Sequence, residues 1–451
     1  MIVLKFGGTS VGSAEVIQNA ITIAWSQADH APVVVCSAMA KTTDTLVRLA
    51  QAALDGREDQ VRRELDLLST LHLDALAGLT SGETRSTGQD LIQNLLDELS
   101  SLARGLLLIQ EVSPRSKDAL LSFGERLSTT LIWLACVERG ISAELLDSRE
   151  FIKTDEKFTE ASILPQATQE AITARVKPRN NHLIICQGFI ASTMSGVTTT
   201  LGRGGSDYSA TIIGAALQAQ EVQIWTDVTG IMTTDPRLIA SAKTISEISY
   251  EEAAELSFFG AKVIHPSTIQ PAVEKEIPVL VKNTNAPEQP GTRICRTVKN
   301  RGIQAITGKN GITVVTVQSS RMLNAHGFLK AIFSVFEKHR ISVDLVSTSE
   351  VSVSMTVNRF EPSLEQVIQE LQSFSRVNVE PDHGIVSLVG TDLWKEASFT
   401  ARVFAALRDI PVRMISLGSS DINLSVVVPQ ENLEQAITLL HQELFPQGEK
   451  G

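Results

Sequence analysis

Cysteine is scarce in this sequence, and its scarcity excludes two kinds of site. Only four cysteines occur among 451 residues, Cys36, Cys136, Cys186 and Cys295, and no two of them lie close together. A C-x-x-C metal or redox motif is therefore absent. A disulfide scaffold is not expected in a chain of this length, and reduced thiols in a cytoplasmic protein are the simpler interpretation.

Positive charge is in short supply as well. The chain has 40 Lys and Arg against 51 Asp and Glu, which gives a formal net charge of −11. Nucleic acids and anionic membranes reward clustered basic residues, so neither is expected as the main partner. If the substrates are themselves anions, the few basic residues have to be concentrated at the site.

Long apolar runs and a leader segment are missing too. No stretch approaches 18 uninterrupted apolar residues, so no membrane span is expected. Residues 1–6 lack the charged segment followed by an apolar one that marks a signal peptide. What remains is the composition of an ordinary globular enzyme, 43% apolar and 20% charged. The length suggests about two to four domains.

Strand and helix patterns alternate over the first 295 residues. Short apolar runs bounded by turn residues predict strands at 2–6, 32–36, 183–190 and 222–226. Helices are expected after the capping residue Ser13, over a long region at 43–108, and at 206–220. This alternation favours an α/β domain with a mostly parallel sheet and helices on both faces.

The tail carries an internal repeat of strand, helix, strand, strand, helix, with copies about 70 residues apart. The first copy is expected at 312–317, 327–338, 342–347, 351–357 and 364–373, and the second at 385–389, 399–407, 412–417, 422–428 and 433–444. A spare strand at 303–306 is expected to complete the second copy, so that the two interlace. The expected domains are 1–295, 303–383 and 384–451, with a linker marked by Pro287, Pro290 and Gly291.

The segment at 5–10 (KFGGTS) ends the first strand and leads into the first helix. Its two adjacent glycines let backbone N–H groups approach a ligand, and a helix N-terminus favours phosphate. A lysine fixed on a strand can neutralise charge on a phosphoryl group during transfer. The plain alternative is a strand–turn–helix corner with a surface lysine. Because the lysine precedes the glycines, the segment is not a P-loop.

A second segment, 198–207 (TTTLGRGGSD), again joins a strand region to a helix start. Three glycines around Arg203 suit close backbone contact with an anion, and arginine can hold a carboxylate bidentately. Asp207 could orient Lys5 or a Mg²⁺ ion. Its alternative role is helix capping, worth about 0.5–2 kcal/mol.

Two weaker segments complete the set. Residues 225–237 (WTDVTGIMTTDPR) follow a strand, and loops at strand C-termini are where α/β sheets bind nucleotides. Arg237 could meet ATP phosphates there, although a surface Asp-Pro-Arg turn is common. In the segment 122–126 (SFGER), Glu125 could accept the α-ammonium of an amino acid, and the alternative is an exposed glutamate at a helix start.

Taken together, these segments resemble the aspartate kinase family. KFGGTSVG, SFGERLS, TTTLGRGGSDYSA, WTDVTGIMTTDPR and ELSFFGAKVIHPST match that family's pattern in the family's order, and the resemblance spans essentially the whole chain. It implies the fold class α/β, with an amino-acid-kinase (carbamate-kinase-like) domain followed by two ferredoxin-like βαββαβ ACT modules. The monofunctional form is expected, because no homoserine dehydrogenase extension follows residue 451.

The resemblance also implies a reaction and a set of site residues. The expected enzyme is a cytoplasmic ATP-dependent phosphotransferase that converts L-aspartate to 4-phospho-L-aspartate, the first step of the lysine, threonine and methionine pathway. No general base is needed, since the β-carboxylate is ionised at pH 7. Mg²⁺ is expected with ATP, without an assigned protein ligand. The implied catalytic residues are Lys5 and Asp207, the substrate-binding residues are Thr43, Glu125, Arg203, Gly204, Gly205 and Ser206, and the ATP-binding residues are Lys5, Gly7, Gly8, Thr226, Asp227, Met232, Arg237 and Lys262.

The tail resembles the lysine-sensitive type of aspartate kinase. Asp344 or Glu350 would pair with the effector ammonium, and the amides near Gly327 would take its carboxylate. The alternative is that these are ordinary strand ends and caps in a dimer interface. A homodimer through the ACT modules is expected, or a tetramer built from it. The implied effector site is Met322, Ala325, Gly327, Phe328, Leu329, Ser342, Val343, Asp344, Ser349 and Glu350.

The sequence departs from the family pattern at a few positions. Asp44 replaces the usual asparagine, so its carboxylate is expected to face away from an anionic substrate or to be neutralised. Thr159 replaces a usual glycine, Met232 an aromatic residue and Ala325 a serine.

Two other functions fit the sequence less well. The ACT tail argues against a kinase for glutamate or acetylglutamate. Intact Lys5, Arg203 and Asp207 argue against a catalytically silent amino-acid sensor.

Overall fold

The computed structural model describes residues 1–260, 264–298, 301–319, 326–418 and 420–446. Lys262, Met322 and Ala325 of the predicted sites lie outside the described residues. The chain forms two compact units. The first consists of Met1–Ile231, Ser246–Tyr250 and Val263–Thr297, and the second of Met232–Ile245, Glu251–Lys262 and Val298–Gly451.

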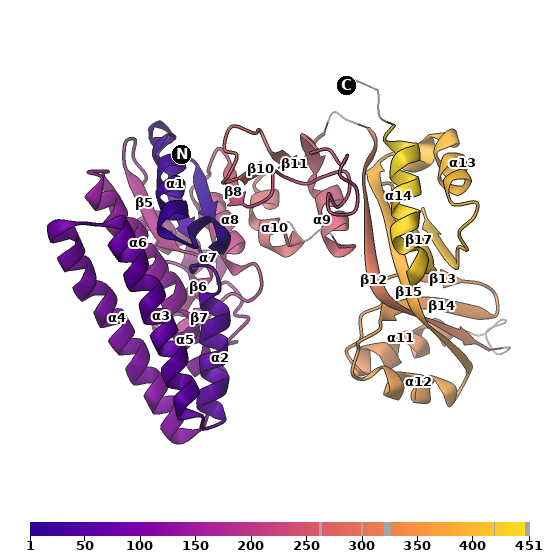
Figure 1. Ribbon diagram of the computed structural model, residues 1–451. Helices are drawn as coiled ribbons and strands as arrows, with labels where there is room; N and C mark the ends of the chain where they lie inside the picture. Colours follow the sequence, from indigo (N-terminus) through magenta and orange to yellow (C-terminus); the bar gives the residue numbers. More distant parts are fainter. Residues whose placement is uncertain (261–263, 299–300, 320–325, 419, 447–451) are drawn as a thin grey trace. The chain divides into compact units, whose positions relative to one another are not determined.

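An eight-stranded sheet of order β3-β5-β2-β1-β8-β10-β11-β9 runs through the first unit, and a small sheet β4-β6-β7 accompanies it (Figure 1). Every pairing in the large sheet is parallel except that of β10 with β11. The strands are β1 Val3–Phe6, β2 Val33–Cys36, β3 Ala143–Leu146, β4 Lys153–Thr154, β5 Leu183–Gln187, β6 Ile190–Thr193, β7 Thr198–Thr200, β8 Val222–Thr226, β9 Glu247–Ser249, β10 Val279–Asn283 and β11 Thr292–Cys295. The predicted α/β domain with a mostly parallel sheet is confirmed.

The helices of the first unit follow the apolar periodicity of the sequence. Ser13 caps α1 as expected, since its side chain accepts a hydrogen bond from the N–H of Val16. The predicted helical region at 43–108 is three helices that lie along one another (Figure 1). Gly56 lies between the first two and Gly82 opens the third, and both adopt positive φ, which interrupts a continuous helix. The helices are α1 Ala14–Trp25, α2 Thr42–Leu54, α3 Glu58–Leu79, α4 Gly82–Ile109, α5 Pro114–Leu121, α6 Phe123–Glu138, α7 Pro165–Arg175, α8 Gly205–Ala216 and α10 Pro266–Glu274.

Helices α5 and α6 run on into each other and form the apolar centre of this unit. Among the described residues, Pro114–Glu138 is the one helical stretch long and apolar enough to cross a membrane by length and composition, with a mean hydropathy of 1.2. Its apolar window is 83% buried inside the protein. Burial of that kind is typical of a core helix.

A six-stranded sheet of order β13-β14-β12-β15-β17-β16 forms the second unit. Helices α11 and α12 belong to one half of it and α13 and α14 to the other (Figure 1). The elements are β12 Gly302–Gln318, α11 Phe328–Lys338, β13 Val346–Thr348, β14 Ser352–Asn358, α12 Leu364–Gln372, β15 Arg376–Thr391, α13 Ala397–Ala406, β16 Met414–Leu417, β17 Asn423–Pro429 and α14 Leu433–Leu444.

The two copies of the repeat share the long central strands β12 and β15. The predicted strands 303–306 and 312–317 are one strand, β12, whose register shifts between Lys309 and Ile312. Its first part pairs with the end of β15, beside β17, and its last part pairs with the start of β15 and with β14. The strand expected at 342–347 is observed at Val346–Thr348, in regular register with β14, while Asp344 and Leu345 just before it make separate backbone hydrogen bonds to Thr356.

Segments that precede residue 295 contribute to the second unit. Ile239 packs in one of its cores, and Phe259 packs in another with Ile312 and Val314. Helix α9 (Tyr250–Phe258) is fixed by buried polar groups, since Glu252 accepts a hydrogen bond from Thr391 Oγ1 at 2.7 Å. The compact units and the predicted domains therefore have different boundaries.

Candidate functional site

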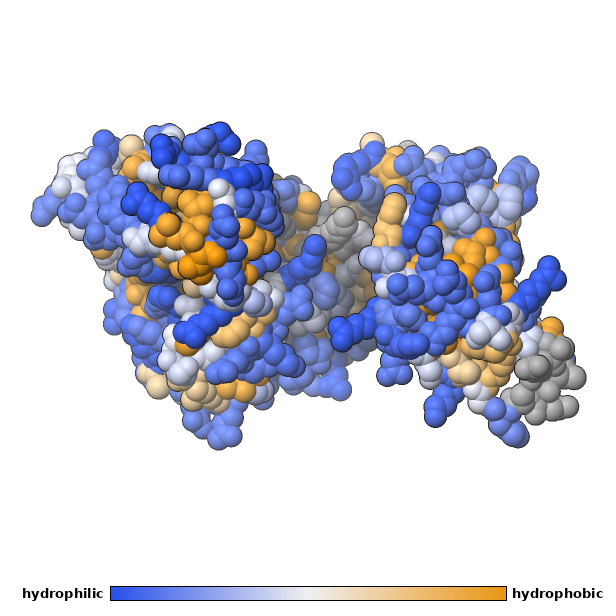
Figure 2. Space-filling view, turned by 90° about the horizontal axis from the view of Figure 1, so that it is seen from below, coloured by the Kyte–Doolittle hydropathy of each residue, from blue (hydrophilic) through white to orange (hydrophobic). Residues whose placement is uncertain are grey.

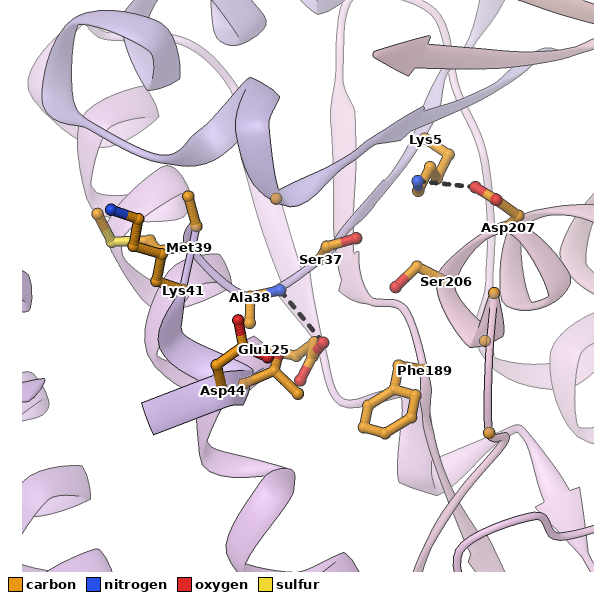
Figure 3. Close-up of a pocket in the computed structure, with 16 residues that line it drawn as sticks. Lys5, Ser37, Ala38, Met39, Lys41, Asp44, Glu125, Phe189, Ser206 and Asp207 are labelled. Carbon is orange, nitrogen blue, oxygen red and sulfur yellow. Dashed lines mark hydrogen bonds and ion pairs between the residues drawn. The ribbon is translucent and has the colours of Figure 1, made fainter. Parts of the chain in front are cut away.

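Lys5 lies in β1, between β2 and β8 in the middle of the large sheet. Its Nζ is 2.7 Å from Oδ1 of Asp207, in the first turn of α8, and both side chains are largely buried. The N-cap of α8 is Gly204, and no side chain caps the helix, so Asp207 pairs with Lys5 and does not serve as the cap. The fold thus joins the first and second predicted segments through one ion pair (Figure 3).

The two glycines after Lys5 leave space beside its ammonium group. Gly7 donates its N–H to the carbonyl of Trp225, and a Cβ on Gly7 would lie 3.4 Å from Lys5 Nζ. A Cβ on Gly8 would lie 3.1 Å from the carbonyl oxygen of Ala38. Gly8 also begins a 3-10 helix, Gly8–Val11, whose N-terminal amides carry partial positive charge. The corner is therefore built for close approach of an anion.

The turn between β7 and α8 needs glycine for its backbone conformation. Gly202 and Gly204 have φ of +72° and +68°, and a Cβ on Gly204 would lie 2.6 Å from Cγ2 of Thr268. Arg203 is exposed between them, and its guanidinium pairs with none of the residues that the structure describes. An exposed cation without a partner is available to a ligand.

Glu125 is buried in the first turn of α6, so the alternative of an exposed glutamate is wrong. Its Oε1 accepts the N–H of Ala38 at 3.2 Å, while within the described chain its buried Oε2 has no hydrogen-bond partner. Burial raises the pKa of this carboxyl to about 8, although the Ala38 N–H opposes the shift. A buried acceptor without a donor is costly, so a ligand that brings an ammonium group would satisfy it.

These elements enclose one cavity of about 370 Å³ in the first unit, into which Lys5, Asp207, Ser206 and Glu125 face (Figure 3). The predicted residues that line it are Lys5, Gly8, Thr43, Glu125, Gly204, Gly205, Ser206 and Asp207. Gly7 and Arg203 adjoin lining residues without being among them. Asp44 also lines the cavity, together with Lys41. Of the two alternatives expected for Asp44, that it faces away is therefore wrong, and that its charge is neutralised stays a prediction.

Sequence reasoning missed part of the lining. The loop 37–41 follows β2, and the carboxyl ends of parallel strands meet at one edge of a sheet, so this loop could have been found from its place after the strand. Phe189 has no such signal. It adopts φ of +66°, held by its N–H to Ser209 Oγ at 3.0 Å, and strain in a bulky residue marks functional sites.

The predicted ATP-binding residues are divided between the two units. Thr226 ends β8, and its Oγ1 donates to Asp227 at 3.2 Å within the first unit. Met232 and Arg237 belong to the second unit. Arg237 is 87% exposed at its side chain and pairs with Asp235 at 2.6 Å. None of these four residues lines the cavity around Lys5, whereas the predicted ATP-binding residues Lys5 and Gly8 do.

The predicted effector residues that the structure describes gather around the start of α11 and the segment before β14. Gly327 is the N-cap of α11, with φ of +89°, and Phe328 and Leu329 open the helix. Asp344 is buried and already paired, because Lys309 Nζ lies 2.7 Å from its Oδ2. The same ammonium lies over the ring of Phe258, 5.0 Å from its centre. Val343 is partly buried, and Ser342, Ser349 and Glu350 are exposed.

Comparison with known proteins gives concordant matches. The amino acid kinase family model matches residues 1–283, and an ACT domain model matches residues 386–444. The lysine-sensitive aspartokinase 3 of Escherichia coli is 38% identical over 99% of both chains. Aspartokinase 1, chloroplastic, of Arabidopsis thaliana is 36% identical over 99% of this chain and 80% of the relative.

Two solved structures of E. coli aspartokinase III cover 99% of this chain at 38% identity. The complex with aspartate and ADP (R-state) superposes with a TM-score of 0.84 and is covered over 100% of its length. The complex with lysine and aspartate (T-state) superposes with a TM-score of 0.81 and is covered over 99%.

Proposed function

Since the chain belongs to the aspartokinase family and is an ATP-dependent kinase acting on aspartate, we propose that the cavity around Lys5 and Glu125 is where aspartate is phosphorylated. An oxygen of the β-carboxylate attacks the γ-phosphorus, the bond to the β–γ bridging oxygen breaks, and ADP leaves. No proton has to move, because the attacking carboxylate is already ionised. One observation carries the proposal: the Lys5–Asp207 pair and the unpartnered Oε2 of Glu125 face the same cavity.

The substrate is oriented by two opposite charges, one inside the cavity and one on the glycine turn that adjoins it. Glu125 receives the α-ammonium at its free oxygen, and Arg203 holds a carboxylate bidentately. Thr43 and Ser206 line the space between them. Lys5 then neutralises charge on the phosphoryl group in transit, and Asp207 holds its ammonium in place. Phosphoryl transfer needs this alignment and little covalent chemistry from the protein.

Mg²⁺ would enter with the nucleotide. The described residues contain no group of three or more His, Cys, Asp or Glu suited to a metal. In kinases Mg²⁺ is usually held by phosphate oxygens and water together with one or two carboxylates, so it needs no such group. Its chemical contribution is to neutralise phosphate charge, and we assign it no protein ligand.

Formation of aspartyl hydroxamate tests the substrate. Purified protein, ATP, Mg²⁺, aspartate and hydroxylamine are expected to give the hydroxamate, because hydroxylamine traps an acyl phosphate. Glutamate and acetylglutamate serve as matched controls and are expected to give little product. Product from those acids and none from aspartate would contradict the assigned substrate, and no product at all would favour the silent sensor.

We further propose that the enzyme opens the lysine, threonine and methionine pathway in the cytoplasm and that lysine inhibits it. The proposal draws on the relative named lysine-sensitive and on the acidic residue Asp344 next to α11. Since Lys309 already neutralises Asp344, an effector ammonium bound there has to displace an ammonium of the protein itself. Lys309 is such a competitor within the protein. It lowers the apparent affinity for lysine in proportion to the fraction of molecules in which Asp344 is not paired with it.

Lys309→Met is therefore expected to tighten lysine binding by about tenfold, since it removes the competitor. Isothermal titration of the full chain measures the dissociation constant. Lys338→Met is the matched control, because it removes a lysine of the same unit that pairs with Glu370 at the surface. An unchanged dissociation constant in Lys309→Met would contradict competition by Lys309. If millimolar lysine does not inhibit the wild-type enzyme, lysine is not the effector.

A homodimer through the second unit is also proposed, with a tetramer as the larger alternative. The sheet ends in two edge strands, β13 and β16, and an unpaired edge is a template for another chain. Apolar side chains are exposed on both edges, at Val346, Ile415 and Leu417. Figure 2 shows patches of hydrophobic side chains on the second unit, as it does on the first. Burial of such residues between copies would be favourable.

A further inference from the structure

Asp118 and Glu125 lie on one continuous helical stretch. Helix α5 passes into α6 without a break, because Ser122 donates its N–H to Asp118 O at 3.1 Å and Arg126 donates to Ser122 O at 3.2 Å. Seven residues make about two turns, so the two carboxyl groups point to the same side of the helix, separated by about 10 Å along its axis. Both are buried, and only Glu125 lines the cavity.

The carboxylate of Asp118 receives three hydrogen bonds from two distant segments. Its Oδ2 accepts the N–H of Thr159 at 2.9 Å and the N–H of Thr200 at 3.0 Å, and its Oδ1 accepts Thr200 Oγ1 at 2.7 Å. Burial raises the pKa of this carboxyl, and the three donors oppose the shift. Hydrogen bonds to a charged group with no exposure to water are strong and hold geometry well.

Both segments support the glycine turn that carries Arg203. Thr200 is the last residue of β7, directly before the turn. Thr159 adopts φ of +76°, where a glycine is easier, and its bond to Asp118 offsets part of that strain. A Cβ on Gly202 would lie 3.5 Å from Thr159 O and 3.2 Å from Glu160 Cγ. The glycine turn therefore packs directly against the loop that contains Thr159 and Glu160.

We propose that Asp118 is a positioning residue for aspartate, which fixes the separation between Glu125 and the turn of Arg203. This rests on the proposed placement of aspartate between these two residues. One helix carries the ammonium acceptor, and the same helix anchors the turn that carries the carboxylate-binding arginine. Aspartate has to reach both groups at once, so a turn that is no longer fixed relative to the helix has to be ordered when the substrate binds, which weakens binding.

Asp118→Ala and Thr200→Val test the link in the full enzyme. Asp118→Ala is expected to raise KM for aspartate about tenfold, with kcat and KM for ATP within about twofold of wild type. Thr200→Val removes only the hydrogen bond from Thr200 Oγ1 and is expected to raise KM for aspartate about threefold. Asp118→Asn is expected to stay near wild type, because its amide oxygen can accept both N–H groups and its NH₂ can donate to Thr200 Oγ1.

A matched control is Glu64→Ala, which also removes a buried carboxylate, one that pairs with Arg48 at 2.9 Å outside the cavity. It should leave KM for aspartate unchanged. If Asp118→Ala fails to fold, Thr200→Val carries the test. The proposal is overturned if neither variant raises KM for aspartate, if KM for ATP rises equally, or if Asp118→Asn is as impaired as Asp118→Ala. An unchanged KM in Glu125→Gln would instead overturn the placement of the substrate.

Discussion

Lys5→Ala is expected to lower kcat by about 100-fold or more, the usual loss for one preorganised donor at a developing charge. The side chain projects from a strand that is held on both sides by parallel neighbours, and Asp207 fixes its ammonium at 2.7 Å. Nothing has to reorganise when charge appears on the phosphoryl oxygens. KM for aspartate should change much less, since the proposed placement has Glu125 and Arg203 hold the substrate.

Lys153→Ala is the matched control for this variant. Lys153 is also a partly buried strand lysine, but its Nζ donates to Arg149 O at 2.8 Å and to Ser192 Oγ at 3.0 Å, away from the cavity. It should keep kcat within about twofold if it folds like wild type. Steady-state rates at saturating ATP and aspartate compare the two. A near-normal kcat in Lys5→Ala would remove Lys5 from the mechanism.

Glu125→Ala is expected to raise KM for aspartate by about 100-fold, which is the size of a lost charge-assisted hydrogen bond in a buried site.

The pH dependence gives an independent check. The pKa of Glu125 is about 8 in the free enzyme, so at pH 7 most molecules carry the protonated form, which binds an ammonium poorly. We therefore expect kcat/KM for aspartate to rise with pH through 8, and Glu125→Gln to lose this rise. A wild-type profile that is flat between pH 7 and 9 would contradict the assignment.

The same group predicts an opposite effect on stability. Its folded pKa of about 8 lies above the ordinary value of 4.5. The folded state therefore favours the protonated carboxyl. The contribution of this group to the free energy of unfolding is fully present below pH 4.5 and is lost as the pH rises through 8. Glu125→Gln avoids that loss, so it should have a higher Tm than wild type at pH 8. Its KM for aspartate should nevertheless be higher than that of wild type. Thermal unfolding at pH 5 and pH 8 measures the difference, and a less stable variant at pH 8 would argue against a buried, unsatisfied carboxylate.

Local patterns predicted much of the fold and of the site. The Lys-Phe-Gly-Gly corner, the cap at Ser13 and the glycine turn around Arg203 depend on neighbouring residues, so their chemistry can be found in a short window. The repeat in the tail was also visible, because each copy has the same succession of elements.

Features that depend on distant contacts were not predicted. The segment around Glu125 alone suggested an exposed helix start, and only the packing of α6 against the loop at Ala38 buries the carboxyl. Asp344 looked free for an effector, because its partner Lys309 comes from another strand. The strand expected at 342–347 begins only at Val346, and just before it Leu345 packs in a core with Phe259, a residue from a far part of the chain.

The division of the chain into units also bears on protein engineering. The polypeptide passes from one unit to the other at 231, 245, 250, 262 and 297. A chimera that grafts the tail of a relative after residue 297 would keep native Ile239, Glu252 and Phe259 against foreign partners. Recombination that keeps the second unit intact should transplant residues 232–245 and 251–262 along with the tail, as three fragments exchanged together.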